Sequence, residues 1–306
     1  MSLSWRKAKL NLLVGATGFI GCHLAKYLFE RGEISKAIFR RGAFLKILDT
    51  YGIQCIEADL QDHNTLHEAF EDVDTVFNLA FPNPNTAESY EYFLGTSMRN
   101  LIKTSIEFKV RNFVSLSTIE VYDVEDSKVD TSSIKPRTAY SYAKAEADRM
   151  VMELSKSGIN VGIVRSARAL GEYDVWLSLK LAEMIDAGKV VIPKFWLMSF
   201  SHPRDICISM CDIAKREESL KVLNVKSFDC SSIELINSIS RFMEVNPKIY
   251  TPSIVRRSTL PKYTNLQLSE HLFLEEDKSW SSYSYKPSVD LESTAREIAS
   301  WYRKKR

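Results

Sequence analysis

The residues best suited to acid–base chemistry are Tyr140 and Lys144, which form a Y-x-x-x-K motif in the segment Tyr140-Ser141-Tyr142-Ala143-Lys144. Side chains four residues apart share one face of an α-helix, so the Lys144 ammonium can lie beside the Tyr140 hydroxyl. A nearby positive charge favours the phenolate form, and Tyr140 could then act as a general base or acid near neutral pH. Tyr142 lacks this arrangement, because Glu146 stands four residues after it.

A third hydroxyl group that could complete such a site follows a strand predicted over residues 112–116. Thr118 stands there, with Ser117 beside it. A hydroxyl at this position can hydrogen-bond a substrate oxygen and stabilise the charge that develops on it. We therefore predict Thr118, Tyr140 and Lys144 as catalytic residues and Ser117 as a substrate contact. Strand-edge packing or a local turn is the alternative interpretation of Thr118.

A glycine-rich loop, G-x-x-G-x-x-G over residues 15–21, lies between a predicted strand at 10–14 and a predicted helix at 20–31. Glycine permits a tight turn and a close approach of the backbone to a pyrophosphate, and the helix N-terminus then offers N–H groups to the phosphates. The loop predicts a dinucleotide site with contacts from Gly15, Thr17, Gly18, Phe19, Ile20 and Gly21.

The end of the second predicted strand bears on which dinucleotide is bound. An acidic residue there usually binds the ribose 2′-hydroxyl of NAD, but this chain has Arg40 and Arg41. A guanidinium can bind a 2′-phosphate through paired hydrogen bonds, so the sequence favours NADP over NAD. Stacking on the adenine, or exposure to solvent, is the alternative. Further cofactor contacts are predicted from Asp59, Leu60, Leu79 and Ala80 at the ends of the next strands, and from Tyr140 and Lys144.

The elements that must position these residues alternate between short apolar segments and amphipathic ones through the first half of the chain. Strands are predicted at residues 36–39, 55–58, 75–79 and 160–164, and helices at 43–51, 64–70, 90–108 and 139–156. This alternation predicts an α/β fold, a Rossmann-type doubly wound parallel sheet. Residues 1–168 are predicted as the NAD(P)-binding domain and 169–306 as mostly a smaller substrate-binding lobe, segments of which can return to the sheet. A last amphipathic helix is predicted over 291–302.

Composition and charge exclude several other classes of protein. The chain has 41 basic and 39 acidic residues, a net charge of +2, which argues against a partner that is a nucleic acid or a membrane. No apolar run approaches the roughly 18 residues needed to span a bilayer, and no secretory signal is recognised. Five cysteines without a C-x-x-C motif indicate free thiols in a cytoplasmic protein. No metal site is predicted: His63 and His67 are interpreted as a solvated helix face.

Together these motifs resemble the extended short-chain dehydrogenase/reductase family, especially its nucleotide-sugar epimerase/dehydratase branch. The resemblance runs over nearly the whole chain. It rests on the motifs GATGFIG (15–21), Asn78-Leu79-Ala80, STIEVY (117–122), YSYAK (140–144), His202-Pro203-Arg204-Asp205-Ile206 and Tyr285-Lys286-Pro287. It implies that Tyr140 exchanges a proton with a substrate hydroxyl while hydride passes to or from the nicotinamide, and that Lys144 also binds the nicotinamide ribose. It further implies a homodimer in which the helix at 90–108 and the helix carrying Tyr140 form a four-helix bundle with their counterparts.

Departures from the family pattern leave three hypotheses open. Many nucleotide-sugar members carry an Asn in an R-x-x-N segment, where this chain has Arg165-Ser166-Ala167-Arg168. Arg168 is therefore predicted as a substrate contact. Arg256 is predicted as another, because it could supply the arginine with which the C-terminal lobe of family members binds the diphosphate. The leading hypothesis is an NAD(P)-dependent epimerase, dehydratase or reductase acting on a nucleotide sugar. The alternatives are an NADP-dependent carbonyl reductase of a non-nucleotide substrate, similar to the dihydroflavonol reductases, and a non-catalytic dinucleotide-binding sensor.

Overall fold

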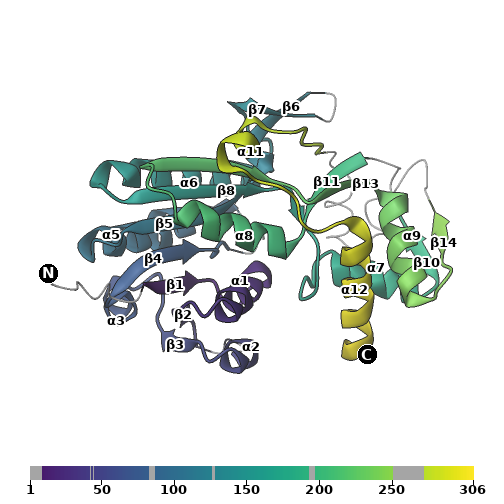
Figure 1. Cartoon of the computed structure of the whole chain (residues 1–306), viewed down its shortest axis with the longest axis horizontal. Coiled ribbons are helices and arrows are strands. Elements are labelled where there is room, and N and C mark those ends of the chain that lie inside the picture. The colour runs from purple at the N-terminus through teal and green to yellow at the C-terminus, as the bar shows by residue number, and fades with distance from the viewer. Residues whose placement is uncertain are drawn as a thin grey trace, which may run out of the picture. The chain divides into compact units, whose positions relative to one another are not determined.

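The structure is a computed structural model that describes residues 9–41, 43, 45–82, 87–125, 128–192, 197–250 and 272–306 (Figure 1). The chain divides into two compact units that interleave along the sequence. Unit 1 comprises Met1–Ser117, Pro136–Arg165 and Cys207–Leu223, and unit 2 comprises Thr118–Lys135, Ser166–Ile206 and Asn224–Arg306. Among the described residues, no helix combines the length and apolar character needed to cross a bilayer.

Unit 1 is built on a seven-stranded sheet with the order β12-β8-β5-β4-β1-β2-β3. Its strands are β1 (Leu10–Val14), β2 (Ser35–Phe39), β3 (Gln54–Glu57), β4 (Val73–Asn78), β5 (Asn112–Thr118), β8 (Asn160–Ser166) and β12 (Leu220–Val225), the last residues of β5, β8 and β12 belonging to unit 2. The β1–β2, β2–β3, β1–β4 and β4–β5 pairs are parallel. The strand order runs outward from β1 through β2 to β3 on one side and from β4 through β5 and β8 to β12 on the other, so it reverses between β1 and β4. Ligands of doubly wound sheets bind at the carboxyl ends of the strands where the order reverses.

Helices connect these strands. They are α1 (Phe19–Glu30), α2 (Lys46–Thr50), α3 (His67–Phe70), α4 (Ala87–Tyr92), α5 (Arg99–Glu107), α6 (Ala139–Leu154) and α8 (Pro203–Ala214), with the short turns η1 (His63–Leu66), η2 (Phe93–Met98) and η4 (Ser155–Ser157). The main core of the unit joins apolar side chains of the sheet, among them Val76 and Phe113, to Phe70 of α3, Leu101 of α5 and Val151 of α6. Helix α6 starts at a capping box in which Thr138 and Ser141 exchange hydrogen bonds between side chain and backbone.

Unit 2 contains small sheets and helices around a separate core. The strands are β6 (Tyr122–Glu125), β7 (Lys128–Ile134), β9 (Arg168–Ala169), β10 (Lys189–Val191), β11 (Leu197–Ser201), β13 (Phe228–Ser231) and β14 (Lys248–Tyr250); the helices are η3 (Ile119–Val121), α7 (Ser178–Asp186), α9 (Ser232–Met243), α11 (Lys278–Tyr283) and α12 (Leu291–Lys305). Apolar residues of α7, α9 and α12, such as Leu181, Ile239 and Ile298, form its core. The motif at 202–206 has a structural role here, since the buried Asp205 accepts hydrogen bonds from Ser227 and from the backbone N–H of Ser288.

The predicted fold class is confirmed, and most predicted elements are found within two or three residues of their expected ends. The helix predicted over 90–108 differs, because it consists of α4, the π-helical segment η2 and α5 in direct succession. A π-helical turn adds a residue to the helical repeat and changes which side chains face a neighbouring site.

Candidate cofactor pocket and active site

The glycine loop between β1 and α1 leaves no room for side chains at two positions. Gly15 has a φ of 90°, and a Cβ atom there would lie 2.7 Å from the backbone nitrogen of Ala80 at the end of β4. A Cβ atom on Gly21 would lie 2.1 Å from the carbonyl oxygen of Gly15. These contacts explain the glycines physically: the first lets the loop pack against β4, and the last lets α1 approach the loop.

Gly18 is the N-cap of helix α1 and has no side chain that could cap the helix. The loop is closed by a hydrogen bond from the Gly18 N–H to the Gly15 carbonyl oxygen, 3.0 Å long. The first N–H groups of a helix have no intrahelical acceptor, so this N-terminus can bind an anionic group. The loop therefore fits the pyrophosphate of a dinucleotide.

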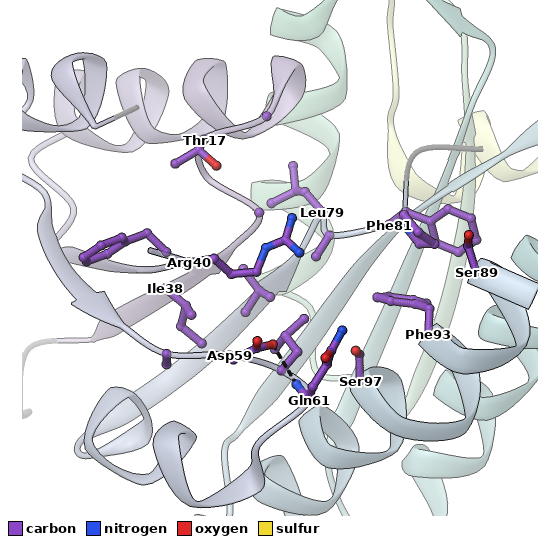
Figure 2. A pocket seen from close by; sticks show the side chains of 18 of the residues that line it. Thr17, Ile38, Arg40, Asp59, Gln61, Leu79, Phe81, Ser89, Phe93 and Ser97 are labelled. Atoms are coloured by element: carbon purple, nitrogen blue, oxygen red, sulfur yellow. Dashed lines mark hydrogen bonds between the residues drawn. The ribbon is translucent and has the colours of Figure 1, made fainter. Parts of the chain in front are cut away.

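A cavity of about 530 Å³ opens at this edge of the sheet (Figure 2). Eight of the predicted cofactor contacts line it: Gly15, Thr17, Gly18, Arg40, Asp59, Leu60, Leu79 and Ala80. Phe19, Ile20 and Gly21 continue into α1 and are not among the lining residues, and neither are Arg41, Tyr140 and Lys144. The volume lies within the range of small-molecule and cofactor sites.

The two arginines after β2 have different surroundings. Figure 2 shows the Arg40 side chain extending into the cavity, between Thr17 and Asp59. Arg41 lies outside and is largely exposed, and its Nε donates to Glu57 Oε1 over 3.0 Å. Arg40 is thus the arginine available to a ligand in this cavity.

The aromatic side of the cavity was not predicted from the sequence. Phe81 stands three residues after the end of β4, and Tyr92, Phe93 and Ser97 line the cavity from α4 and the π-helical segment η2. Figure 2 shows Phe81 and Phe93 close together, and their ring centroids are 5.3 Å apart. The apolar residue after the Asn78-Leu79-Ala80 strand end was the one available signal for Phe81, whereas a π-helical turn has no comparable sequence signal.

Phe81 also contacts the predicted catalytic pair. Its ring meets the Tyr140 ring edge-on at 5.7 Å, and the Lys144 Nζ lies 3.9 Å from the Phe81 ring centroid. Tyr140 and Lys144 stand one turn apart on α6, and the Lys144 ammonium is 6.0 Å from the Tyr140 ring centroid. Lys144 is buried, and its Nζ donates to the carbonyl oxygen of Leu116 in β5 over 3.1 Å. The structure therefore holds the ammonium of Lys144 at one place between α6 and β5, near Tyr140.

One helical turn after Lys144, a buried ion pair joins α6 to β8. Arg165 Nε donates to Asp148 Oδ2 over 2.8 Å, and the two side chains are 6% and 4% exposed. Burial raises the pKa of the Asp148 carboxyl, and the Arg165 guanidinium, a hydrogen bond from Ser117 and the charge of Lys144 act in the opposite direction. Ser117 is thus buried against Asp148, a position that the sequence did not reveal.

The remaining predicted site residues belong to unit 2 or lie outside the described residues. Thr118 ends β5, and its hydroxyl accepts a hydrogen bond from the Glu120 N–H over 3.2 Å. Arg168 in β9 has an Nη2 atom 3.6 Å from Glu120 Oε1, and its buried Nη1 has no hydrogen-bond partner among the described residues. A guanidinium that has an N–H group not engaged in a hydrogen bond can bind an anionic group through it. Arg256 lies outside the described residues.

The fold, the glycine loop and the cavity together define a dinucleotide-binding protein of the Rossmann type. The model of the NAD dependent epimerase/dehydratase family matches residues 11–195, more than half of the chain. The chain therefore belongs to the NAD dependent epimerase/dehydratase family.

Curated relatives include enzymes with different substrates. The chain is 28% identical over 186 residues to sterol demethylase protein B of Methylococcus capsulatus, covering 58% of this chain and 56% of the relative. It is 28% identical over 172 residues to UDP-N-acetyl-alpha-D-glucosaminuronate decarboxylase of Bacillus cytotoxicus, covering 51% and 53%. In these two matches the chain spans about half the length of the relative.

Among solved structures, the chain is similar to UDP-glucuronic acid 4-epimerase from Bacillus cereus in complex with UDP-glucuronic acid and NAD. The TM-score is 0.80 at 16% identity, and the match covers 97% of this chain and 100% of the other. At this identity the likeness establishes the fold alone, over nearly the full length of both chains.

Proposed function

We propose that this protein is an NAD(P)-dependent enzyme that epimerises, dehydrates or reduces a nucleotide sugar, with Tyr140 as the general acid or base. The observation that carries the proposal is the pair on α6, with the Lys144 ammonium fixed by Leu116 near Tyr140 and with Phe81 touching both the pair and the cavity. The nicotinamide, when bound, would accept or supply the hydride. Tyr140 would take the proton from a substrate hydroxyl as the carbonyl forms, or return it as the carbonyl is reduced.

The supporting groups follow from their chemistry and from the family motif. The positive charge of Lys144 favours the phenolate of Tyr140. Thr118, whose role is carried over from the motif, would hydrogen-bond the reacting substrate oxygen. Arg168, whose buried Nη1 makes no hydrogen bond within the described part of the chain, would bind an anionic group of the substrate, a diphosphate or a carboxylate.

Replacing the Tyr140 hydroxyl tests whether the protein is an enzyme at all. Tyr140→Phe should lower turnover by two to four orders of magnitude, roughly the contribution of a positioned acid or base, while dinucleotide binding stays within a few-fold. If the biological function survives in Tyr140→Phe, the protein is a dinucleotide-binding sensor and the proposal is wrong.

A second candidate function is an NADP-dependent carbonyl reductase of a non-nucleotide substrate. Arg168 in the place of the usual Asn supports it, and so does the similarity to the sterol demethylase protein. The two candidates are separated by titrating the cofactor-loaded protein with UDP- and dTDP-sugars and by assaying NADPH oxidation with aldehydes and ketones. Saturable binding of a nucleotide sugar supports the first candidate; carbonyl-dependent oxidation without such binding supports the second.

For the cofactor, we propose that NADP binds more tightly than NAD, because Arg40 and not an acidic residue extends into the cavity after β2. A charge-assisted contact to the 2′-phosphate contributes about 1.5–3 kcal/mol, which corresponds to roughly 10- to 150-fold in affinity. Calorimetric titration of cofactor-free protein should show this preference, and Arg40→Ser should abolish it.

Arg41→Ser is the matched control, because Arg41 pairs with Glu57 outside the cavity. The preference for NADP should persist in this variant. Tighter binding of NAD, or loss of the preference in Arg41→Ser and not in Arg40→Ser, contradicts the assignment and favours an epimerase or dehydratase that recycles NAD.

A further inference from the structure

Two histidines and a glutamate converge on the surface of unit 1, away from the cofactor cavity. His63 is the first residue of η1, His67 the first residue of α3, and Glu107 the last residue of α5. One potential ligand atom from each side chain lies within 4.8 Å of the other two. The interpretation of both histidines as a solvated face is correct for His67, whose side chain is 51% exposed, but not for His63, which is 19% exposed. Glu107 comes from a helix distant in sequence and could not be assigned to this pair from spacing.

We propose that His63, His67 and Glu107 bind a divalent transition-metal ion, with Zn²⁺ as the best match. Two imidazoles and one carboxylate are the ligand set of many zinc sites that keep a fourth position for water. Imidazole nitrogens select zinc, copper and nickel over magnesium and calcium, which prefer oxygen ligands. The site would hold the ion by three protein ligands and leave one position to solvent, on the exposed side of His67.

The distances suit such an ion after small side-chain adjustments. His63 Nε2 is 2.9 Å and His67 Nε2 is 3.8 Å from the same oxygen, Glu107 Oε2. Ligand atoms of a tetrahedral zinc ion, with bonds of about 2.0–2.2 Å, are about 3.4 Å apart. The two observed distances lie on either side of that value.

The orientation of His63 supports an external partner for its ring nitrogen. His63 Nε2 is buried and forms an ion-pair contact of 2.9 Å with Glu107 Oε2, but it makes no hydrogen bond within the described residues. A buried ring nitrogen that makes no hydrogen bond is costly, and an ion placed between the nitrogen and the carboxylate would satisfy both.

Neighbouring groups hold the three ligands in place. Lys103 Nζ lies 3.6 Å from Glu107 Oε1, so the carboxylate can keep this pairing through one oxygen and offer Oε2 to the ion. The two imidazole rings are nearly perpendicular, at 86°, and the His67 ring packs against Phe108 at 5.6 Å. Partners of this kind orient metal ligands and tune their affinity.

The three residues of the proposed metal site are not among those that line the cofactor cavity. Helix α3 leads into the amino end of β4 and α5 into that of β5, whereas the cavity is at the carboxyl ends (Figure 1). A bound ion would therefore join η1, α3 and α5 without contacting the cofactor, and its effect should be on the stability of unit 1.

Calorimetric titration of the full chain with ZnCl₂, after removal of metal by EDTA and gel filtration, tests the proposal. We expect one ion per chain with a dissociation constant in the micromolar range. His63→Gln, His67→Gln and Glu107→Gln should each weaken binding at least tenfold. His23→Gln, a histidine on α1 outside the cluster, is the matched control and should leave the affinity unchanged. At a Zn²⁺ concentration a hundred times the dissociation constant, the melting temperature should rise by about 5 °C in the wild type and not in His67→Gln.

The half-buried thiol of Cys55 is the competing zinc ligand, so Cys55→Ser and the visible spectrum of the Co²⁺ form complete the experiment. Zinc affinity that persists in His67→Gln but is lost in Cys55→Ser overturns the proposal, as does a thiolate-to-cobalt charge-transfer band. The absence of saturable binding to a wild-type protein that still binds dinucleotide also overturns it. Because the His67 side chain is half-exposed, His67→Gln should fold, and its melting temperature without zinc provides the check.

Discussion

Replacing Arg165 by Met should destabilise the protein far more than a change of similar size on its surface. Arg165 and Asp148 are both almost fully buried and are joined by a contact of 2.8 Å. Met retains much of the volume of the arginine stem but leaves the Asp148 carboxylate buried without its main partner. Removing one member of a buried ion pair costs about 3–5 kcal/mol, because the remaining charge is desolvated and uncompensated. We expect this loss in the free energy of unfolding at pH 8, measured by urea denaturation.

The same variant should have a characteristic pH dependence. Burial already raises the pKa of Asp148, and loss of the Arg165 guanidinium raises it further. A carboxyl group whose pKa is raised in the folded state binds a proton more readily there than in the unfolded state. Its contribution to the free energy of unfolding therefore falls as the pH rises from the unfolded pKa, about 3.9, to the folded pKa. The free energy of unfolding that Arg165→Met loses relative to wild type should therefore shrink by up to about 1.4 kcal/mol per pH unit as the pH is lowered from 8 to 5.

The double variant Asp148→Leu/Arg165→Met is the control, because it removes both charges and should be within about 2 kcal/mol of wild type. A deficit below 1 kcal/mol for Arg165→Met at pH 8, or a deficit that does not change between pH 8 and pH 5, would refute the reasoning. Either result would mean that water or another cation reaches Asp148.

Three further predictions concern the loop, the helix cap and the assembly. Gly21→Ala should abolish dinucleotide binding in calorimetric titrations, since its Cβ would lie 2.1 Å from the Gly15 carbonyl oxygen; Gly95→Ala, where nothing lies within 4 Å, should bind normally. Thr138→Ala should cost about 1 kcal/mol in thermal unfolding, because it removes the capping box of α6, and an unchanged stability would contradict this. The protein should form a homodimer by light scattering at micromolar concentration, through the helices of residues 90–108 and α6, which expose Ile106 and Tyr142; a monomer would refute this.

The fold was predictable because its signals are local. Strand β1 is an apolar run that ends at a glycine, and the alternation of such runs with amphipathic segments requires parallel strands joined by helices. The loop residues Gly15 and Gly21 were predictable for the same reason: tight packing at the start of a Rossmann sheet demands glycine within a short stretch of chain.

The parts of the site that were not predictable depend on contacts between distant segments. Asp148 and Arg165 read as ordinary helix and strand residues until α6 packs on β8 and removes both from water. Similarly, the spacing of His63 and His67 is compatible with any helix, and only the packing of α5 adds Glu107. Sequence patterns report the periodicity of one element, whereas the environment of a polar side chain depends on what another element covers.

The packing of the sheet edge explains how the loop and the proposed catalytic lysine can be held in register. Gly15 packs against the backbone of Ala80, and the Ala80 N–H donates to the buried Asn78 side chain over 3.2 Å. The Asn78 amide in turn donates to Ser115 of β5 over 3.3 Å, and the next residue along β5, Leu116, accepts from Lys144. A shift of any one of these strands would therefore move the Lys144 ammonium relative to the loop. Because every link is backbone or a buried polar side chain, the sheet sets the position of Lys144 relative to the loop before a ligand binds, which would reduce the ordering that cofactor binding must supply.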